Sequence, residues 1–206
     1  MEEPRSTTDQ MKNVEGALMT ERDLSNYMEY LDVTIGEIVR WGKILEIGSG
    51  TEQNFAKEIR ERGYGNKVIS IDPRLALPEL IDLGGMFPEE HEARLRGRKN
   101  PEVNTIAALA QNLPIESGSV DAILASRSVP LYISSQEDMD SVLTEMCRVL
   151  KVGGEIRIYP VAVGEKRKVV EISLRNLLEL EVLSWEIKLE EGSSLNYLLK
   201  IKKIPR

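Results

Sequence analysis

The sequence predicts a single α/β domain over residues 1–206, with a doubly wound, seven-stranded, mainly parallel sheet closed by a C-terminal antiparallel hairpin. Three observations predict this fold. Short apolar runs alternate with segments of helical periodicity, a glycine turn joins the first run to a helix, and a tight turn joins the last two runs. Such alternation gives parallel strands, right-handed crossovers and helices on both faces of the sheet.

The N-terminal region divides into an arm and a helix. Residues 1–20 are polar and irregular, and we predict a flexible arm there. Apolar residues then recur at helical spacing from Leu24 to Val39, Asp23 can cap their start, and Gly42 follows their end. We therefore predict one amphipathic helix between Asp23 and Gly42.

The first strand is predicted over residues 43–47. It runs into Gly48, Ser49 and Gly50, and apolar residues at helical spacing follow this turn. The pattern indicates a buried strand, a glycine turn and a helix. Glycine at Gly48 and Gly50 lets a backbone approach a ligand closely, at the start of a helix whose first N–H groups have no partner within the helix.

Further apolar runs and periodic segments predict the rest of the sheet and its helices. Two strands joined by a tight turn must be antiparallel, which gives the closing hairpin. The interval of residues 74–104 is longer than a crossover needs, so we predict an insertion or lid there, with a short helix over residues 77–83. The predicted strands cover residues 68–71, 103–108, 120–125, 155–161, 182–189 and 195–204, the predicted helices cover residues 135–150 and 168–180, and the hairpin turn covers residues 191–194.

Composition narrows the class of protein. Hydrophobic residues make up 41% of the chain and charged residues 30%, the balance of a soluble globular domain. The net charge of −7 argues against a nucleic-acid partner. The lone Cys147 cannot form an internal disulfide and the N-terminus lacks a secretory pattern, so we expect a cytoplasmic setting. No run reaches the ~20 apolar residues of a membrane helix, and one histidine and one cysteine predict no metal site.

Asp72 is the first candidate for ligand chemistry. It follows the second predicted strand, some twenty residues beyond the glycine turn. A carboxylate at that place can accept hydrogen bonds from both hydroxyls of a ribose. The alternative is a cap or turn residue before Pro73.

Four segments resemble, in order, the motifs of class I S-adenosylmethionine-dependent methyltransferases. Glu46, two places before the first glycine, is typical of that family, whereas nicotinamide-binding Rossmann proteins usually carry a small or apolar residue there. The resemblance implies a Rossmann-like methyltransferase fold and S-adenosylmethionine as cofactor. The four segments are KILEIGSGT, VISIDP, ALAQNLPIESGSVDAI and EMCRVLKVGGEIRIYPV. The cofactor-binding residues that the resemblance implies are Glu46, Gly48, Ser49, Gly50, Asp72, Ala110, Gln111 and Ser126.

Two positions depart from the pattern of the family. Glu52 stands where many relatives have a third glycine, and Leu109 stands where an acidic residue often contacts adenine. These departures leave open a non-catalytic, methyltransferase-like binding or scaffolding module. A nicotinamide-dependent oxidoreductase is a further alternative, but Gln53 occupies the third glycine of its fingerprint, and that class does not explain the closing hairpin.

The resemblance also implies a reaction, in which an acceptor atom displaces the sulfonium methyl group directly and the protein mainly aligns the reactants. We expect a small-molecule acceptor above the carboxyl ends of strands four and five. Arg127, Tyr132 and Tyr159 would bind it there, with Tyr27 or Tyr30 above. The alternative for Arg127 is an ion pair at its loop. If the acceptor must lose a proton, the candidates to take it are Tyr132, Tyr159 and His91.

Overall fold

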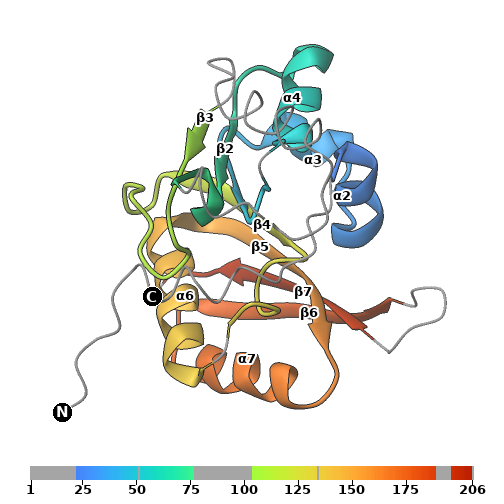
Figure 1. Cartoon of the computed structure of the whole chain (residues 1–206). Coiled ribbons are helices and arrows are strands. Elements are labelled where there is room, and N and C mark those ends of the chain that lie inside the picture. Colours follow the sequence, from blue (N-terminus) through green and yellow to red (C-terminus); the bar gives the residue numbers. More distant parts are fainter. Residues whose placement is uncertain (1–21, 51, 77–103, 134, 189–195, 206) are drawn as a thin grey trace, which may run out of the picture.

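The computed structural model describes residues 22–50, 52–76, 104–133, 135–188 and 196–205. Its strands form one seven-stranded sheet in the order β3-β2-β1-β4-β5-β7-β6, in which β1 to β5 are parallel and β7 runs antiparallel between β5 and β6 (Figure 1). The predicted sheet is confirmed. The strands are β1 Ile44–Ile47, β2 Val68–Ile71, β3 Asn104–Ile106, β4 Val120–Ser126, β5 Leu150–Ala162, β6 Leu180–Lys188 and β7 Asn196–Lys203.

Helices cover both faces of this sheet (Figure 1). The three N-terminal helices α2, α3 and α4 pack on one face, and α6 and α7 pack on the other. No described helix is long and apolar enough to cross a membrane. The helices are α2 Leu24–Leu31, α3 Ile35–Arg40, α4 Asn54–Ile59, α6 Gln136–Val149 and α7 Glu165–Arg175, with a π-helical turn at Arg60–Tyr64 and a 3-10 turn at Pro73–Ala76.

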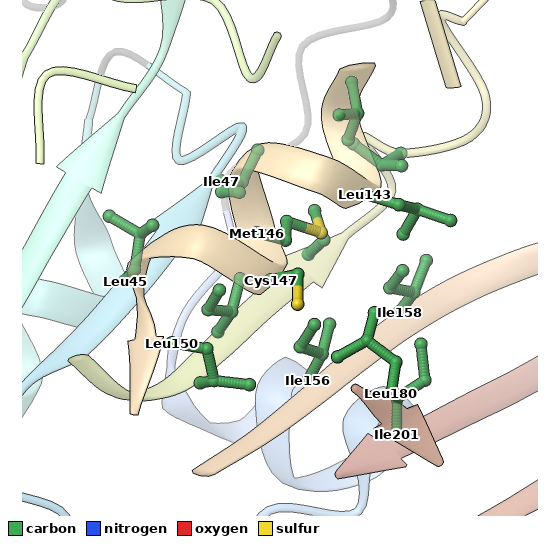
Figure 2. Close-up of a cluster of buried hydrophobic side chains, with 14 of the residues drawn as sticks. Leu45, Ile47, Leu143, Met146, Cys147, Leu150, Ile156, Ile158, Leu180 and Ile201 are labelled. Atoms are coloured by element: carbon green, nitrogen blue, oxygen red, sulfur yellow. The ribbon is translucent and has the colours of Figure 1, made fainter. Parts of the chain in front are cut away.

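Helix α6 forms the centre of the larger core. Its residues Met139, Val142, Leu143 and Met146 are buried, and Ser135 caps its start by accepting from the backbone N–H of Asp138. Figure 2 shows Leu143, Met146 and Cys147 of this helix facing apolar side chains of the sheet. Burial of this kind contributes roughly 1.5 to 3 kcal/mol for each large apolar side chain. This core therefore holds the sheet in place, together with the loops that follow the carboxyl ends of its strands.

The prediction of one helix between Asp23 and Gly42 is wrong. Asp23 does cap the start of α2, but Asp32 adopts a left-handed conformation with φ 53° and ends that helix. Thr34 then starts α3, since its side chain accepts from the N–H of Glu37 while Glu37 bonds back to the N–H of Thr34. Leu31 and Ile35 keep the helical spacing of apolar residues across the break, so the sequence pattern conceals it.

Gly153 and Gly154 belong to strand β5, which starts earlier than the predicted strand over residues 155–161. Strand β5 already begins at Leu150, which pairs with Val120, while Glu155 pairs with Ala122. The intervening residues form a bulge rather than a separate turn before the strand. A Cβ at Gly154 would lie 2.8 Å from the backbone oxygen of Asp121, so only glycine fits there.

Several predictions concern residues outside the described ranges. These are the arm, the helix over residues 77–83, the hairpin turn over residues 191–194, His91, and most of the insertion over residues 74–104. They stay predictions.

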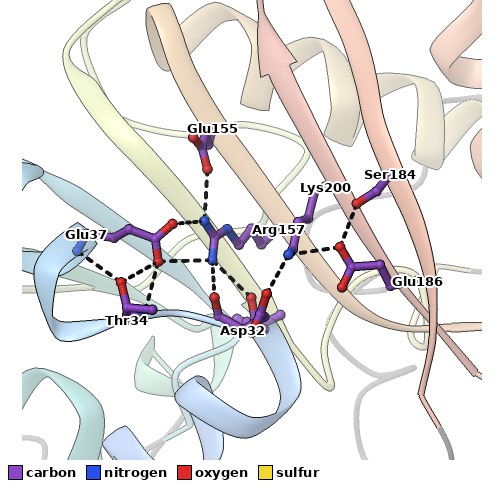
Figure 3. Close-up of polar contacts among 9 residues, drawn as sticks. Asp32, Thr34, Glu37, Glu155, Arg157, Ser184, Glu186 and Lys200 are labelled. Atoms are coloured by element: carbon purple, nitrogen blue, oxygen red, sulfur yellow. Dashed lines mark hydrogen bonds and ion pairs between the residues drawn. The ribbon is translucent and has the colours of Figure 1, made fainter.

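A buried arginine attaches the N-terminal helices to the sheet (Figure 3). The guanidinium of Arg157 in β5 bonds the carbonyls of Leu31 and Asp32 and the carboxylates of Glu37 and Glu155. Arg157 is only 4% exposed, so these partners compensate a charge removed from water. They fix the ends of α2 and α3 against the sheet, which in turn places α2 over the carboxyl ends of the strands.

Candidate functional site

The glycine loop after β1 is tied to the end of β2. Ile71 accepts hydrogen bonds from the backbone N–H groups of Gly48 at 2.7 Å and Ser49 at 3.2 Å, and the Asp72 carboxylate accepts one from Gly50 at 2.9 Å. Gly48 and Gly50 both have positive φ, 75° and 74°. The loop thus has a left-handed backbone at two places, which explains the preference for glycine.

The two glycines face different surroundings. A Cβ at Gly48 would lie 2.3 Å from the Cβ of Ser128, whose hydroxyl donates to the Ile47 carbonyl at 2.7 Å. A Cβ at Gly50 would meet no described atom within 4 Å. Gly48 is therefore required by close packing within the protein, whereas Gly50 leaves its backbone accessible to a ligand.

Glu46 lies beneath this loop in a buried polar cluster. Its carboxylate accepts hydrogen bonds from the hydroxyls of Tyr27 and Ser70, both at 2.6 Å. Burial raises the pKa of Glu46, because the charged form loses its hydration, and the two hydrogen bonds act against that shift. Burial and the neighbouring Glu46 raise the pKa of Tyr27 well above its ordinary value. A buried carboxyl held in this way is typical of a functional site.

Ser126 brings the end of β4 into the same region. It pairs with Tyr159 of β5, and its side chain is fully buried. Its hydroxyl has no hydrogen-bond partner among the described residues. Buried hydroxyls nearly always have a partner, so Ser126 is a candidate for a contact with a ligand.

All of the predicted cofactor residues except Ala110 and Gln111 therefore lie at the carboxyl ends of β1, β2 and β4. These strands are neighbours, and the chain adds strands to one side of β1 first and to the other side from β4 on. Ligands of open α/β sheets bind at this point of reversal. Ala110 and Gln111 lie half-buried in the turn after β3, where Asn112 donates to the Leu109 carbonyl. The contacts of these two residues with a cofactor stay a prediction.

The predicted acceptor residues divide into a stack and two outliers. The guanidinium of Arg127 lies 4.9 Å from the ring centroid of Tyr30 in α2, and Tyr30 stacks on Tyr159 at 5.5 Å. Tyr27 instead stacks on Phe55 and directs its hydroxyl to Glu46, while Tyr132 is 44% exposed after β4. The structure thus brings Arg127 and Tyr159 together through Tyr30.

Glu52, the unusual residue of the loop, interacts with the helix that follows. One of its carboxylate oxygens lies 3.8 Å from the Nζ of Lys57 in α4. Its charge is therefore partly balanced within the protein. No group of three or more histidine, cysteine or acidic side chains in the described ranges could hold a metal ion.

Three side chains at the site were not predicted from the sequence. Arg22 is 8% exposed, and its Nη2 donates to the Gly48 carbonyl at 2.5 Å. Gln53 is fully buried with a left-handed backbone at the start of α4, and Ser128 packs against Gly48. Arg22 and Ser128 gave no local signal because each is far from Gly48 along the chain. For Gln53 the sequence shows only that it replaces the third glycine of the nicotinamide-binding fingerprint.

Comparisons with known proteins agree with this geometry. The family model of a methyltransferase domain matches residues 45–158. A ubiquinone/menaquinone biosynthesis C-methyltransferase of Geobacter is 31% identical over 117 residues, which cover 57% of this chain and 44% of that protein. An anamorsin homolog of Populus trichocarpa is 35% identical over 104 residues, which cover 48% of this chain and 36% of that protein. The chain thus spans less than half the length of these curated relatives.

Solved structures agree on the fold. The N-methyltransferase NodS from Bradyrhizobium japonicum, in complex with S-adenosylhomocysteine, superposes with a TM-score of 0.54 at 14% identity. The match covers 82% of this chain and 84% of that one. At this identity the likeness concerns the arrangement of the sheet and helices.

Proposed function

The chain belongs to the methyltransferase domain family, within the class I S-adenosylmethionine-dependent methyltransferases, and we propose that it transfers the methyl group of S-adenosylmethionine to a small-molecule acceptor by direct displacement. One observation carries the proposal. The glycine loop, the Asp72 carboxylate and the Ser126 hydroxyl lie at the carboxyl ends of neighbouring strands, where the strand order reverses. The Ser126 hydroxyl has no hydrogen-bond partner among the residues that the structure describes.

The described residues fit the cofactor. The open space at Gly50 allows close approach to the loop backbone, and the buried Ser126 hydroxyl offers an unused hydrogen bond. Asp72 is held at the end of β2, where a carboxylate can accept from ribose hydroxyls. The residues that would hold the cofactor are Glu46, Gly48, Ser49, Gly50, Asp72, Ala110, Gln111 and Ser126.

The charges of the site also suit the charges of the cofactor. S-adenosylmethionine carries a sulfonium and an ammonium group, and Glu46 and Asp72 place two carboxylates in this region. A cation close to Glu46 would favour its ionised form, against the effect of burial on its pKa. Cofactor binding would therefore stabilise a charge that is costly in the ligand-free protein.

In this proposal the protein accelerates the reaction mainly by aligning the acceptor with the methyl group of the cofactor. The bound cofactor would supply an electrophilic methyl group. The acceptor atom would form a bond to this methyl carbon as the carbon–sulfur bond breaks, and the electron pair of the broken bond would stay on sulfur. The product of the cofactor would be S-adenosylhomocysteine. Arg127, with its planar donor fork, would hold an anionic part of the acceptor, and Tyr30 and Tyr159 would border it. If the acceptor releases a proton, the phenolate form of Tyr132 or Tyr159 would take it, and the imidazole of His91 is the third candidate.

Two observations bear on the acceptor. The net charge of −7 does not suit a nucleic-acid acceptor. The relatives reported above include a C-methyltransferase of quinone biosynthesis and an N-methyltransferase, so the acceptor atom differs between proteins that share this domain. We infer a small acceptor without fixing its reacting atom.

The test is calorimetric titration with S-adenosylmethionine, S-adenosylhomocysteine and NAD in parallel. We expect the first two to bind and NAD not to bind. Binding of NAD alone would favour the oxidoreductase, and binding of none would favour a scaffolding module.

Asp72 gives the internal check. Asp72→Ala should weaken binding of S-adenosylhomocysteine by about 1.5 to 3 kcal/mol, the value of hydrogen bonds to a charged group. Asp72→Asn keeps an oxygen that can accept from the Gly50 N–H but removes the negative charge. This variant therefore separates the role of Asp72 in holding the loop from its role as a charged acceptor for the ribose hydroxyls. Glu116→Ala, at an exposed carboxylate, is the matched control. Unchanged affinity in both Asp72 variants would remove Asp72 from the site.

A further inference from the structure

We propose that Arg22 binds the α-carboxylate of the cofactor's amino-acid end, an inference that rests on the proposed function. Arg22 lies before α2, outside the segment that matches the family model. Its guanidinium reaches across to the glycine loop, where Nη2 donates to the Gly48 carbonyl at 2.5 Å. A buried cation at a loop that faces a zwitterionic ligand is a candidate for its anionic group.

Three contacts fix the backbone next to Arg22. The Asp23 side chain caps α2 by accepting from the N–H of Asn26 at 3.1 Å. The Leu24 N–H donates to the Glu58 carboxylate of α4. The Tyr27 ring stacks on Phe55 of α4 at 4.1 Å. Arg22 is thus presented to the loop by a rigid support, which limits the entropy that binding would cost.

The charges around the loop require a cation for the carboxylate. Glu46 and Asp72 are both buried, at 1% and 2% exposure, and either would repel an incoming carboxylate. Glu46 and Asp72 instead suit the ammonium and the ribose. Arg22 supplies the opposite charge on the same loop, and its planar fork can donate two parallel hydrogen bonds to a carboxylate.

Arg22 also belongs to the polar cluster of Glu46. The charge of Arg22 lowers the pKa of both Tyr27 and Glu46, against the effect of burial on each. The guanidinium therefore lies close enough to act on both groups. A carboxylate bound at Arg22 would meet an ammonium near Glu46, which matches the two ends of an α-amino acid.

The test compares two ligands that differ only in the carboxylate. S-adenosylhomocysteine and its decarboxylated analogue are titrated by calorimetry into the wild type, Arg22→Gln and Arg22→Lys. Arg175→Gln, at an exposed arginine of α7, is the matched control. Thermal melting without ligand checks that each variant is folded.

We expect the wild type and Arg175→Gln to bind S-adenosylhomocysteine about 10- to 100-fold more tightly than the analogue. Arg22→Gln should bind S-adenosylhomocysteine about 10- to 100-fold more weakly than the wild type does, and it should bind the decarboxylated analogue with the affinity of the wild type. Arg22→Lys should recover part of the loss, since it keeps the charge without the fork.

Other outcomes would overturn the inference. A wild type that binds both ligands equally does not use the carboxylate, and an Arg22→Gln variant that weakens both equally shows a structural role. Tighter binding by Arg22→Gln would mean that the guanidinium occupies the place of the ligand ammonium at the Gly48 carbonyl. Each of these leaves the proposed function standing. A folded wild type that binds neither ligand would refute the proposed function itself, and this inference with it.

Discussion

Replacing Gly48 by alanine should destabilise the fold far more than the same change at Gly50. Both residues have nearly equal positive φ, so each variant bears a left-handed backbone cost of roughly 1 to 2 kcal/mol. Only at Gly48 does the new methyl group collide, 2.3 Å from the Cβ of Ser128, where carbon atoms prefer about 3.5 to 4 Å. Overpacking of this kind adds roughly 1 to 3 kcal/mol.

The expected loss is therefore about 2 to 5 kcal/mol for Gly48→Ala and about 1 to 2 kcal/mol for Gly50→Ala. The higher half of the first range is favoured, because the Ser128 hydroxyl is bonded to the Ile47 carbonyl and cannot move away without losing that bond. Urea unfolding, followed by the fluorescence of Trp41 and Trp185 and by circular dichroism, measures both free energies.

Ser128→Gly completes a double-mutant cycle with Gly48→Ala. Removing the Ser128 side chain should restore a large part of the stability that Gly48→Ala loses, because the colliding atom is gone. Equal losses for the two alanine variants, or no coupling between Gly48 and Ser128, would refute the close approach. Cofactor affinity should show a different pattern, with Gly50→Ala folded but weakened in binding, because its methyl group enters the space beside the loop.

Three further outcomes are expected. Arg157→Met should lower the free energy of unfolding by about 3 kcal/mol, because Glu37 is left partly buried without its cation. A loss below about 1 kcal/mol in urea unfolding would contradict the role of Arg157 in attaching the N-terminal helices to the sheet. Ser126→Ala should leave ligand-free stability nearly unchanged but weaken S-adenosylhomocysteine binding by about 0.5 to 1.5 kcal/mol in calorimetry; unchanged binding would exclude a contact. The Arg148 hydrogen bond lowers the pKa of Glu145, so the Glu145 carboxylate stabilises the fold above the pKa it has when unfolded. This contribution is lost as the pH falls below about 4. Glu145→Gln should therefore reduce the loss of stability between about pH 7 and about pH 3, measured by urea unfolding at both pH values.

The sequence alone predicted the sheet, its parallel part and its closing hairpin. These features depend on periodicity, on turn residues and on chain order, all of which are local. The resemblance carried by Glu46, the glycine turn and Asp72 also placed the centre of the candidate site, because parallel strands end at one edge of their sheet. Local signals failed at the N-terminal helices, where Leu31 and Ile35 keep the helical spacing across the break that Asp32 and Thr34 make.

Only the tertiary structure decided how distant residues complete the site. Arg22 and Ser128 reach Gly48 from 26 and 80 positions away, and Tyr27 and Ser70 meet Glu46 from two different elements. No window of the sequence contains such pairs, since the order of strands and the packing of α2 on the sheet bring them together. The sequence therefore determined which strand ends carry the site, and the fold determined which buried charges and hydroxyls meet there, because electrostatic and steric contacts depend on distance in space and not along the chain.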